Sequence, residues 1–266
     1  RSTPKPSSAA SDVYKRQQNT QPALLTVSTI AYHLLGVEPL VAAGHSLGEY
    51  SALVAAGSLS FEDAVVLVHK RGRYMQEAVP VGKGMMVAVI GLEYEKVWEV
   101  ISQITTGVVE VANWNSREQI VISGERQAVE EAVERLKAPR AVTLPVSAPF
   151  HCSLMTPAEE KLALDLEKTE FKDLKFPVIT NVDAEPVTRG SEAREALKKQ
   201  VTRTVLWYKS MAKLREMSIQ AVVEVGASKV LSGLMKRIAR GWDNSPTVLQ
   251  VGDPASLEKA QQVLSG

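Results

Sequence analysis

Short apolar segments alternate with amphipathic segments along most of this chain, and this alternation constrains the fold more than any other feature. The apolar segments predict strands at residues 40–43, 177–181 and 221–225. The amphipathic segments predict helices at residues 23–34, 49–56, 61–79, 157–167, 191–200, 206–216 and 230–240. Strands that alternate with helices are typical of a mostly parallel sheet covered by helices. The sequence therefore predicts an α/β fold.

The middle of the chain follows a different order. Strands are predicted at residues 85–90, 108–112, 119–123 and 141–144, with helices at 93–104 and 125–137. The order β-α-β-β-α-β is that of a ferredoxin-like unit. We therefore predict that residues 84–145 form a small ferredoxin-like subdomain, inserted into a large α/β subdomain built from residues 18–83 and 146–266.

The first 17 residues, RSTPKPSSAASDVYKRQ, are rich in Ser, Pro and Lys and show no hydrophobic period. Segments of this composition do not bury enough apolar surface to fold. We expect residues 1–17 to be disordered, and we hypothesise that they are not native to the protein.

Composition narrows the class of protein further. Lys and Arg number 31 and Asp and Glu number 30, and a net charge of +1 argues against a dedicated nucleic-acid binder. The single cysteine, Cys152, excludes a disulfide framework and a Cys-based structural zinc site. No apolar run approaches the roughly 18–20 residues that span a bilayer, and the N-terminus lacks the pattern of a signal peptide. We expect a cytoplasmic monomer that does not bind membranes.

A candidate nucleophile lies in the segment Gly44-His45-Ser46-Leu47-Gly48, between a predicted strand and a predicted helix. A sharp strand-to-helix turn strains the serine backbone and exposes its hydroxyl, and small flanking residues let the chain pass. The N–H of Leu47 then points to where an oxyanion would form, at the positive end of a helix dipole. The alternative is a glycine-rich turn with an incidental serine. We predict that Ser46 is a nucleophile and that Leu47 supplies an oxyanion donor.

A serine nucleophile needs a base, and the chain has four histidines, at positions 33, 45, 69 and 151. His33 lies within a helix, His45 diverges from the adjacent Ser46, and His69 lies on a polar helix face. His151 follows two prolines in a short loop of small residues, and such a rigid loop can hold a base. The alternative is a surface histidine with no role. Cys152 has no second histidine to activate it. We therefore predict that Cys152 is a small buried residue that only fills space in the core.

Arg71 lies on the apolar face of its helix. The apolar stripe consists of Ala64, Val68, Met75 and Val79. At about 100° per residue Arg71 falls inside this stripe, whereas Lys70 and Arg73 fall roughly opposite. The mid-helix Gly72 suggests that another segment packs closely there. A buried guanidinium needs an anion, and two remain open: a structural partner such as Glu49 or Asp63, or a substrate carboxylate held bidentately.

Together these residues resemble a known family. The chain is similar, from about residue 18 to 249, to the malonyl-CoA:acyl carrier protein transacylases, the acyltransferases of fatty acid synthesis. The resemblance rests on Gln21-Pro22-Ala23-Leu24, residues 44–53 (GHSLGEYSAL), Arg71-Gly72-x-x-Met75-Gln76, Asn113-x-Asn115-Ser116, Val121-Ile122-Ser123-Gly124, Pro145-Val146-Ser147…His151 and Glu224-Val225-Gly226. It implies a hydrolase-like core with the inserted small subdomain.

The resemblance implies roles for individual residues. Ser46 would be acylated, His151 would be its base, and Arg71 would bind the free carboxylate of malonate. The backbone carbonyl of Gln200 would orient the histidine in place of an acid, and Leu47 N–H would be one oxyanion donor. Three further residues are placed with the substrate, namely His45, Asn181 and Phe150, of which Phe150 resembles the malonyl-preferring form in related polyketide acyltransferases.

The implied reaction is a ping-pong transfer. Ser46 takes the malonyl group from malonyl-CoA and passes it to the phosphopantetheine thiol of acyl carrier protein, with no metal or redox cofactor. The C-terminal basic residues could dock an acidic carrier or CoA phosphates; they are Lys229, Lys236, Arg237 and Arg240. The alternative is a solvated helix face.

One departure from the family concerns the N-terminal motif. Family members begin with a strand and a Gly-Gln-Gly-Ser-Gln turn that supplies the second oxyanion N–H, and this sequence contains no such turn. We therefore expect weak or no activity from this chain. Two other functions stay open: a serine esterase of the α/β-hydrolase kind, and a carrier-binding remnant without activity. The esterase class places its histidine near the chain end, whereas more than a hundred residues follow His151.

Overall fold

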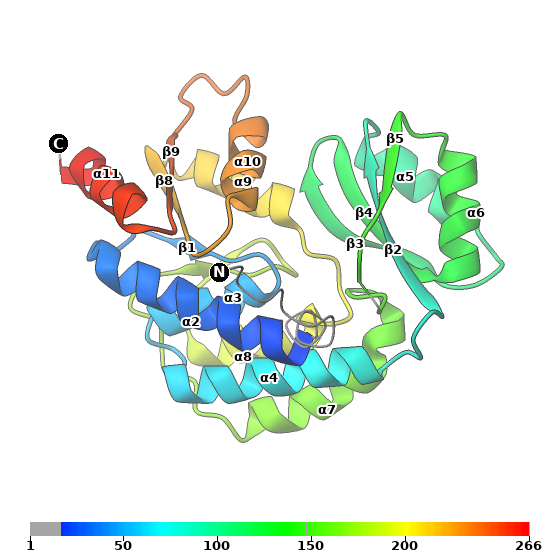
Figure 1. Cartoon of the computed structure of the whole chain (residues 1–266), viewed down its shortest axis with the longest axis horizontal. Coiled ribbons are helices and arrows are strands. Elements are labelled where there is room, and N and C mark those ends of the chain that lie inside the picture. The colour runs from blue at the N-terminus through cyan, green and yellow to red at the C-terminus, as the bar shows by residue number, and fades with distance from the viewer. Residues whose placement is uncertain (1–16, 147, 266) are drawn as a thin grey trace, which may run out of the picture.

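The structure is a computed structural model, and it describes residues 17–146 and 148–265. Figure 1 shows two lobes, with the small lobe formed by the consecutive elements from β2 to β5. The large lobe contains all the other elements. The α/β class predicted from the sequence is confirmed, because helices and strands alternate through the large lobe.

The strands of the large lobe lie in two sheets. β1 (Ala42–Ala43) pairs in parallel with β6 (Val178–Ile179), which pairs antiparallel with β7 (Pro186–Val187). β8 (Ala221–Val225) and β9 (Thr247–Val251) form a separate parallel pair. An apolar cavity of about 600 Å³ lies between β1 and β8. The described strands therefore do not form the single sheet that the alternation predicts.

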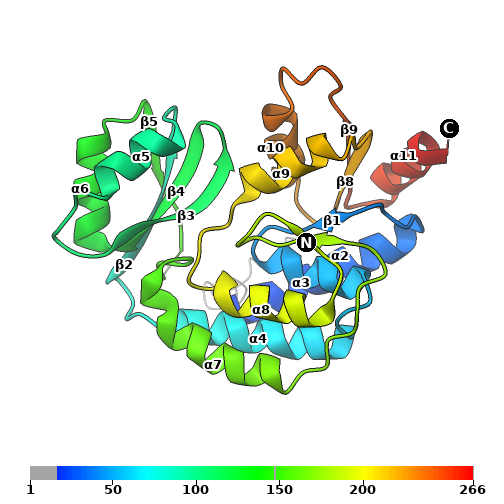
Figure 2. The same ribbon diagram turned by 180° about the vertical axis from the view of Figure 1, so that it is seen from behind.

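Helices surround these strands. They are α2 (Gln17–Leu35), α3 (Leu47–Ala55), α4 (Phe61–Glu77), the 3₁₀ helix η1 (Ser153–Met155), α7 (Thr156–Glu167), α8 (Gly190–Gln200), α9 (Trp207–Glu216), α10 (Val230–Ile238) and α11 (Pro254–Ser265). α2 packs on α4 and α4 packs on α7. Figure 2 shows α8 beside α7, and these two helices pack on each other. No helix among the described residues is both long and apolar enough to cross a membrane.

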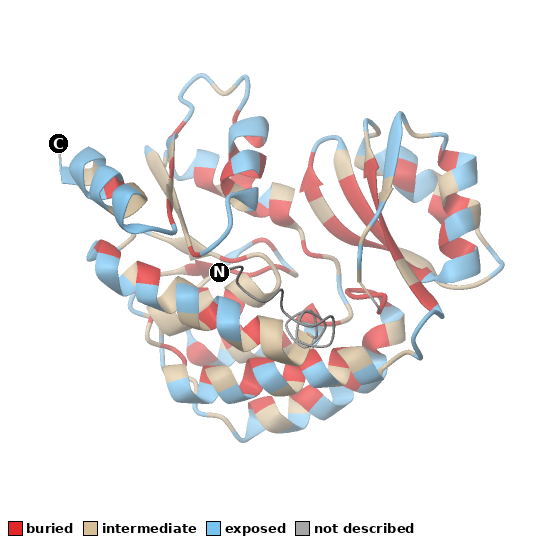
Figure 3. Cartoon of the chain, in the orientation of Figure 1, coloured by how far each residue is buried: buried red, intermediate tan, exposed pale blue. Residues whose placement is uncertain are grey.

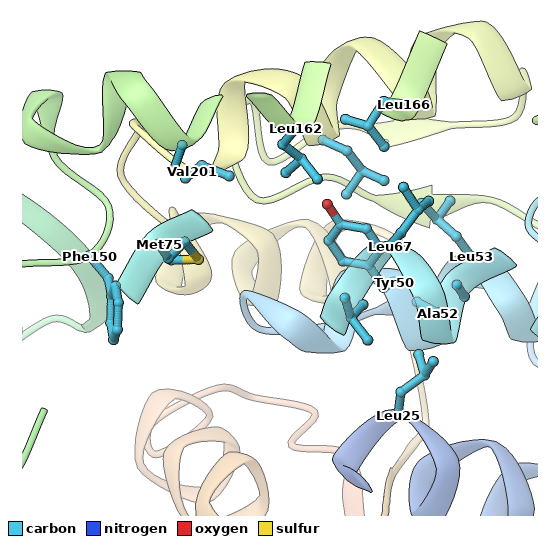
Figure 4. Packing of buried hydrophobic residues seen from close by; sticks show 14 of the residues in the cluster. Leu25, Tyr50, Ala52, Leu53, Leu67, Met75, Phe150, Leu162, Leu166 and Val201 are labelled. Atoms are coloured by element: carbon cyan, nitrogen blue, oxygen red, sulfur yellow. The ribbon is translucent and has the colours of Figure 1, made fainter. Parts of the chain in front are cut away.

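The central helix α4 begins and packs as its sequence predicts. Ser60 caps it, because its hydroxyl accepts a hydrogen bond from the backbone N–H of Asp63 at 3.0 Å. A Cβ at Gly72 would lie 2.6 Å from the backbone of Gln17, so glycine permits the close crossing of α2. Figure 4 shows the apolar contacts between α3, α4 and α7, where Tyr50 and Leu53 meet a cluster that includes Leu67, Leu162 and Leu166.

The small lobe has the predicted element order. It consists of β2 (Gly84–Ile90), α5 (Tyr94–Ile101), β3 (Val109–Ser116), β4 (Gln119–Glu125), α6 (Arg126–Leu136) and β5 (Arg140–Thr143). The four strands form one antiparallel sheet in the order β3-β4-β2-β5. Figure 1 shows α5 and α6 on the face of this sheet that points away from the large lobe.

The two lobes are joined near the loop that carries His151. The edge of β3 pairs with the large lobe, since Trp114 N–H donates to Val205 O and Val205 N–H donates to Ala112 O, both at 2.9 Å. The backbone N–H of Ser153 also donates to a Glu110 carboxylate oxygen at 3.1 Å. These bonds fix the small lobe against the segment between α8 and α9 and against the start of η1.

Several sequence predictions need correction. Helix α2 begins at Gln17, so that residue is not disordered, and the first helix starts before the expected residues; residues 1–16 lie outside the described part of the chain. The predicted strands 40–43 and 177–181 shorten to two residues each. The short strand β7, the strand β9 and the helix α11 were not predicted.

Candidate active site

Ser46 lies at a sharp turn between β1 and α3. Its φ of 53° and ψ of −105° are strained for a residue with a side chain. A Cβ at Gly44 would lie 1.9 Å from the backbone of Gly48, so the turn requires glycine at position 44. At Gly48 an added Cβ would meet no atom within 4 Å. The strained backbone expected of a serine at a sharp strand-to-helix turn is therefore present.

Asn181 holds this turn by its side chain. Its Oδ1 accepts a hydrogen bond from the Ser46 backbone N–H at 2.7 Å, and its Nδ2 donates to the Gly44 carbonyl at 2.6 Å. Asn181 lies two residues after the end of the short strand β6 and is buried. The structure thus places the predicted substrate residue Asn181 against the backbone of the turn.

His151 faces the Ser46 hydroxyl. Its Nε2 lies 2.8 Å from Ser46 Oγ, and its Nδ1 lies 2.8 Å from the backbone carbonyl of Gln200. Because a carbonyl only accepts, Nδ1 carries the hydrogen and Nε2 is free to accept the serine proton. Burial and then the charge of Arg71 lower the pKa of His151 to about 3. The imidazole is therefore neutral near pH 7, which is the form that acts as a base.

The N-terminus of α3 provides an oxyanion donor. Leu47 is the first residue of this helix, and the N–H groups of a first helical turn have no acceptor within the helix. The positive end of the helix dipole also lies here. These features agree with the role predicted for Leu47 N–H.

Arg71 is buried beside the nucleophile, with 1% of its surface exposed. Its Nη2 donates to Ser46 Oγ at 3.0 Å and to Gln200 Oε1 at 2.9 Å. Its Nη1 donates to Gln21 Oε1 at 2.7 Å. The guanidinium carbon also lies 5.6 Å from the centre of the Tyr50 ring.

The guanidinium has no carboxylate in direct contact among the residues that the structure describes. Of the two structural partners considered, Asp63 is exposed and bonds to Ser60, and Glu49 forms no ion pair with Arg71. The Nε of Arg71 is buried without a partner. A buried positive charge held only by neutral oxygens is suited to binding an anion.

Two polar residues of this cluster were missed by the sequence analysis as parts of the site. Glu49 is buried, and its Oε2 accepts hydrogen bonds from Asn181 N–H at 3.0 Å and from Gln200 Nε2 at 2.8 Å. Gln21 is buried and binds Arg71. One signal was available, because Gln21 lies four residues before the buried Leu25 and so on the same helix face.

The other predicted site residues lie around this cluster. His45 Nε2 lies 2.8 Å from Asn115 Oδ1, and its ring packs against Trp207 with the centroids 5.5 Å apart. Burial lowers the pKa of His45. Phe150 is buried near Met75 (Figure 4). The structure thus brings together Ser46, His151, Arg71 and Gln200 by hydrogen bonds. His45 and Phe150 directly precede Ser46 and His151 in the chain.

Cys152 is a buried residue next to the histidine. Its Sγ donates to the Pro149 carbonyl at 3.1 Å, and burial raises its pKa to about 11. A thiol that stays protonated at neutral pH is a poor nucleophile. This environment agrees with the predicted filler role.

A serine on a strained turn, a neutral imidazole and a buried guanidinium form the type of site found in enzymes that make acyl-serine intermediates. The comparison with known families agrees with this class. The chain belongs to the acyl transferase domain family, which matches residues 8–253.

Known relatives and solved structures match most of the length of this chain. It is 44% identical to the malonyl CoA-acyl carrier protein transacylases of Escherichia coli strain K12 over 252 residues and of Bacillus subtilis over 254 residues. These matches cover 92% of this chain and 80% and 79% of the relatives. The corresponding structure from Coxiella burnetii has a TM-score of 0.92 at 41% identity, covering 96% of this chain and 82% of that one. A malonyl-transacylase in complex with a type II PKS acyl-carrier protein has a TM-score of 0.91 at 40% identity, covering 95% and 83%.

Proposed function

We propose that the protein transfers a malonyl group from malonyl-CoA to the phosphopantetheine thiol of acyl carrier protein. The observation that carries this proposal is the buried Arg71 guanidinium, which lies 3.0 Å from Ser46 Oγ and has no carboxylate partner in the described part of the chain. An acyl group with a free carboxylate, esterified to Ser46, would supply that partner. The high identity to enzymes of this name supports the same substrates.

The first half of the reaction acylates Ser46. Its Oγ attacks the thioester carbonyl while His151 Nε2 takes the hydroxyl proton, and Leu47 N–H stabilises the oxyanion that forms. The carbon–sulfur bond then breaks, and the proton on Nε2 passes to the departing CoA sulfur. In the second half the carrier thiol gives its proton to Nε2 and attacks the malonyl ester. Ser46 leaves with that proton, so atoms and charge balance.

The substrate carboxylate would also affect the base. The positive charge of Arg71 contributes to the low pKa of His151. A malonyl carboxylate paired with Arg71 would offset that charge and so raise the basicity of the imidazole. A carboxylated acyl group would in this way favour its own transfer.

We infer the finer architecture of the two lobes from the order and direction of their strands. The strand order β3-β4-β2-β5 with two helices on one face supports a ferredoxin-like small subdomain at residues 84–145. The parallel pairs β1–β6 and β8–β9 support a mostly parallel, hydrolase-like core formed by residues 18–83 and 146–266. We also propose that the reaction uses no cofactor, since every step above moves only protons and one acyl group. The cytoplasmic location and the monomeric state stay predictions.

The carrier partner is supported by the similarity to a transacylase that was solved with an acyl-carrier protein. On and next to α10 the side chains of Lys229, Lys236, Arg237 and Arg240 are exposed, as a docking surface for acidic groups requires. Arg237 also donates to Gln119 Oε1 at 2.5 Å, so this surface extends to the small lobe.

The test begins with the wild-type protein and malonyl-CoA. Intact-mass measurement with peptide mapping should find a malonyl adduct on Ser46. In Arg71→Ala the rate of malonyl transfer should fall about 10- to 100-fold, the equivalent of one charged hydrogen-bond contact. Acetyl transfer should survive or improve. Arg73→Ala, which removes an exposed arginine of the same helix, is the matched control and should change neither rate.

Other outcomes would contradict the proposal. Equal losses for malonyl and acetyl transfer would make Arg71 a structural residue. Hydrolysis of uncharged esters without a carrier would favour an esterase. A folded protein that binds carrier but never forms the adduct would favour a carrier-binding remnant.

A further inference from the structure

Glu49 is a buried carboxylate whose hydrogen bonds go to Gln200 and Asn181 and not to the side chains of Ser46, His151 or Arg71. It lies one helical turn after Ser46, in the first turn of α3, and 1% of its surface is exposed. Ionised carboxylates are rarely buried at this depth without a direct cationic partner. The energetic cost of burying Glu49 therefore calls for an explanation.

The hydrogen bonds of Glu49 determine how the Gln200 side chain is oriented. Gln200 Nε2 donates to Glu49 Oε2 at 2.8 Å and to the Ser46 carbonyl at 2.9 Å. Both of these neighbours are acceptors, so the amide nitrogen must face them. The amide oxygen is consequently turned to Arg71, whose Nη2 it accepts at 2.9 Å. Reversing the amide would place an N–H group against the guanidinium.

The same residue Gln200 serves the base. Its backbone carbonyl accepts the Nδ1 hydrogen of His151 at 2.8 Å. Glu49 Oε2 also accepts the Asn181 backbone N–H at 3.0 Å, and the Asn181 side chain holds the turn of Ser46. One carboxylate oxygen therefore contacts the two residues that hold the nucleophile, the base and the arginine.

We propose that Glu49 is a positioning residue, whose negative charge fixes Gln200 and Asn181 and thereby aligns Arg71 and His151 on Ser46. This proposal rests on the proposed malonyl transfer and deepens it. Because the carboxylate orients the amide that holds Arg71, loss of its charge should impair carboxylated acyl groups more than uncharged ones.

Protonation should weaken the same alignment, because the oxygen of a neutral carboxyl accepts the hydrogen bonds of Gln200 and Asn181 less strongly than that of a carboxylate. The charged and titratable groups that act on Glu49 are Arg71 on α4, Asp183 in the turn after β6, and Tyr50 on α3. Burial raises the pKa of Glu49 to about 7, although its hydrogen bonds and Arg71 oppose that rise. Burial and then the charge of Arg71 lower the pKa of His151 to about 3, far below that of Glu49. As pH falls through 7, Glu49 gains a proton while the imidazole stays neutral. An acidic limb near pH 7 in kcat/KM should therefore report Glu49 and not His151.

The experiment measures the rate of Ser46 acylation between pH 5 and 8 by quenched-flow mass spectrometry. Malonyl-N-acetylcysteamine is the acyl donor, because it lacks the phosphates of CoA. Wild type should show an acidic limb near pH 7. Glu49→Gln should lack that limb and should be slower than wild type at pH 8 by about 10- to 100-fold, as for a misplaced reacting group. Acetyl-N-acetylcysteamine should be affected less.

Two further variants serve as controls for Glu49→Gln. Glu62→Gln replaces an exposed glutamate of α4 and should behave as wild type. Glu49→Asp keeps the charge on a shorter side chain, so it should react more slowly but keep an acidic limb. If Glu49→Gln does not fold, the pH profile of Glu49→Asp tests the proposal in its place. The proposal fails if Glu49→Gln keeps the limb, if it matches wild type at pH 8, or if both acyl groups lose rate equally. A wild type that forms no malonyl-serine would instead defeat the proposed function itself.

Discussion

The cores of the two lobes differ in what they bury. The core cluster of the small lobe is apolar: Val87, Val89, Val97, Ile101, Val111, Ile120, Ile122, Val129, Ala132 and Leu136. The small lobe also buries four polar residues on β3 and β4 that do not belong to this cluster, namely Asn113, Asn115, Ser116 and Ser123. The large lobe buries a comparable apolar cluster, but around its serine it also buries polar groups: Gln21, Glu49, Arg71, His151, Asn181 and Gln200. Figure 3 shows that the buried positions run through the strands of the small lobe and also line the inner helices of the large one.

This difference separates two uses of burial. Apolar side chains leave water at a gain of roughly 25 cal/mol per Å² of surface, so the small lobe is stabilised by the groups that it hides. The polar groups around Ser46 lose their hydration, and their hydrogen bonds offset only part of that unfavourable free energy. Burial of this second type costs stability and is expected where a site must be held rigid and dry.

The largest expected effect is at the turn of the nucleophile. In Gly44→Ala the new Cβ would lie 1.9 Å from the backbone of Gly48, and backbone atoms cannot move aside without displacing Ser46. We expect the free energy of unfolding to fall by more than about 4 kcal/mol, or folding to fail. Any folded protein should acylate Ser46 at least about 100-fold more slowly. Thermal unfolding and the adduct assay measure the two effects.

Gly48→Ala is the control at the other end of the same turn. A Cβ there meets no atom within 4 Å, so the stability should change little. Equal destabilisation by both substitutions would show that the turn is sensitive to any added carbon, and that the close approach at Gly44 is not its cause.

Much of the candidate site could be predicted from the sequence. Ser46 was identified because a glycine-flanked serine stood between a strand and a helix. Arg71 was identified because helical periodicity placed a charged residue on a buried face, and its 1% exposure confirms that inference. The candidate base His151 was chosen by elimination among four histidines, and its Nε2 lies 2.8 Å from Ser46 Oγ. The signal for Arg71 is a conflict between residue type and local environment, whereas that for Ser46 is a local motif and that for His151 is elimination.

Other features leave no such local signal. The Gln200 contact to His151 uses a backbone carbonyl, which every residue carries. Glu49 occupies the first turn of a helix, where acidic residues are common on the surface. Its burial depends on contacts with residues more than a hundred positions away. The two-residue strands β6 and β7 are likewise held by their neighbours, since so short a segment has no periodicity to read.

The apolar core of the small lobe gives the second largest effect. Ile122 on β4 is fully buried, and Ile122→Ala would leave a cavity in this core. We expect a loss of about 2–5 kcal/mol in the free energy of unfolding, measured by denaturant titration. The acylation rate of the folded fraction should stay near that of wild type, because none of the groups that contact Ser46 lies in this core.

This result would test the comparison directly. If Ile122→Ala lowered the acylation rate of fully folded protein as strongly as Arg71→Ala, then the small-lobe core would set the geometry of the site, and the two lobes could not be treated as separate in function.

The smallest effect is expected at an exposed cation on the helix that carries Arg71. Lys70 Nζ lies 2.5 Å from Asp165 Oδ1 and so links α4 to α7, and 36% of its side chain is exposed. Water screens such a pair, and holding the long side chain costs entropy, so Lys70→Met should cost at most about 1 kcal/mol of unfolding free energy. The adjacent Arg71 is buried. Substitutions at these two neighbours therefore allow the effect of a partly solvated charge to be compared with that of a buried charge on the same helix.

A double-mutant cycle isolates the pair, because Asp165 also accepts a hydrogen bond from the Tyr74 hydroxyl at 2.9 Å. The cycle combines Lys70→Met with Asp165→Asn, and the coupling should be below about 1 kcal/mol and should shrink in high salt. The pair Lys96–Glu99, exposed by 56% and 59%, should couple still less. A coupling of several kcal/mol between Lys70 and Asp165 would mean that the α4–α7 contact excludes water as the site does. The pair would then count with the buried charges around Ser46 and not with the solvated surface.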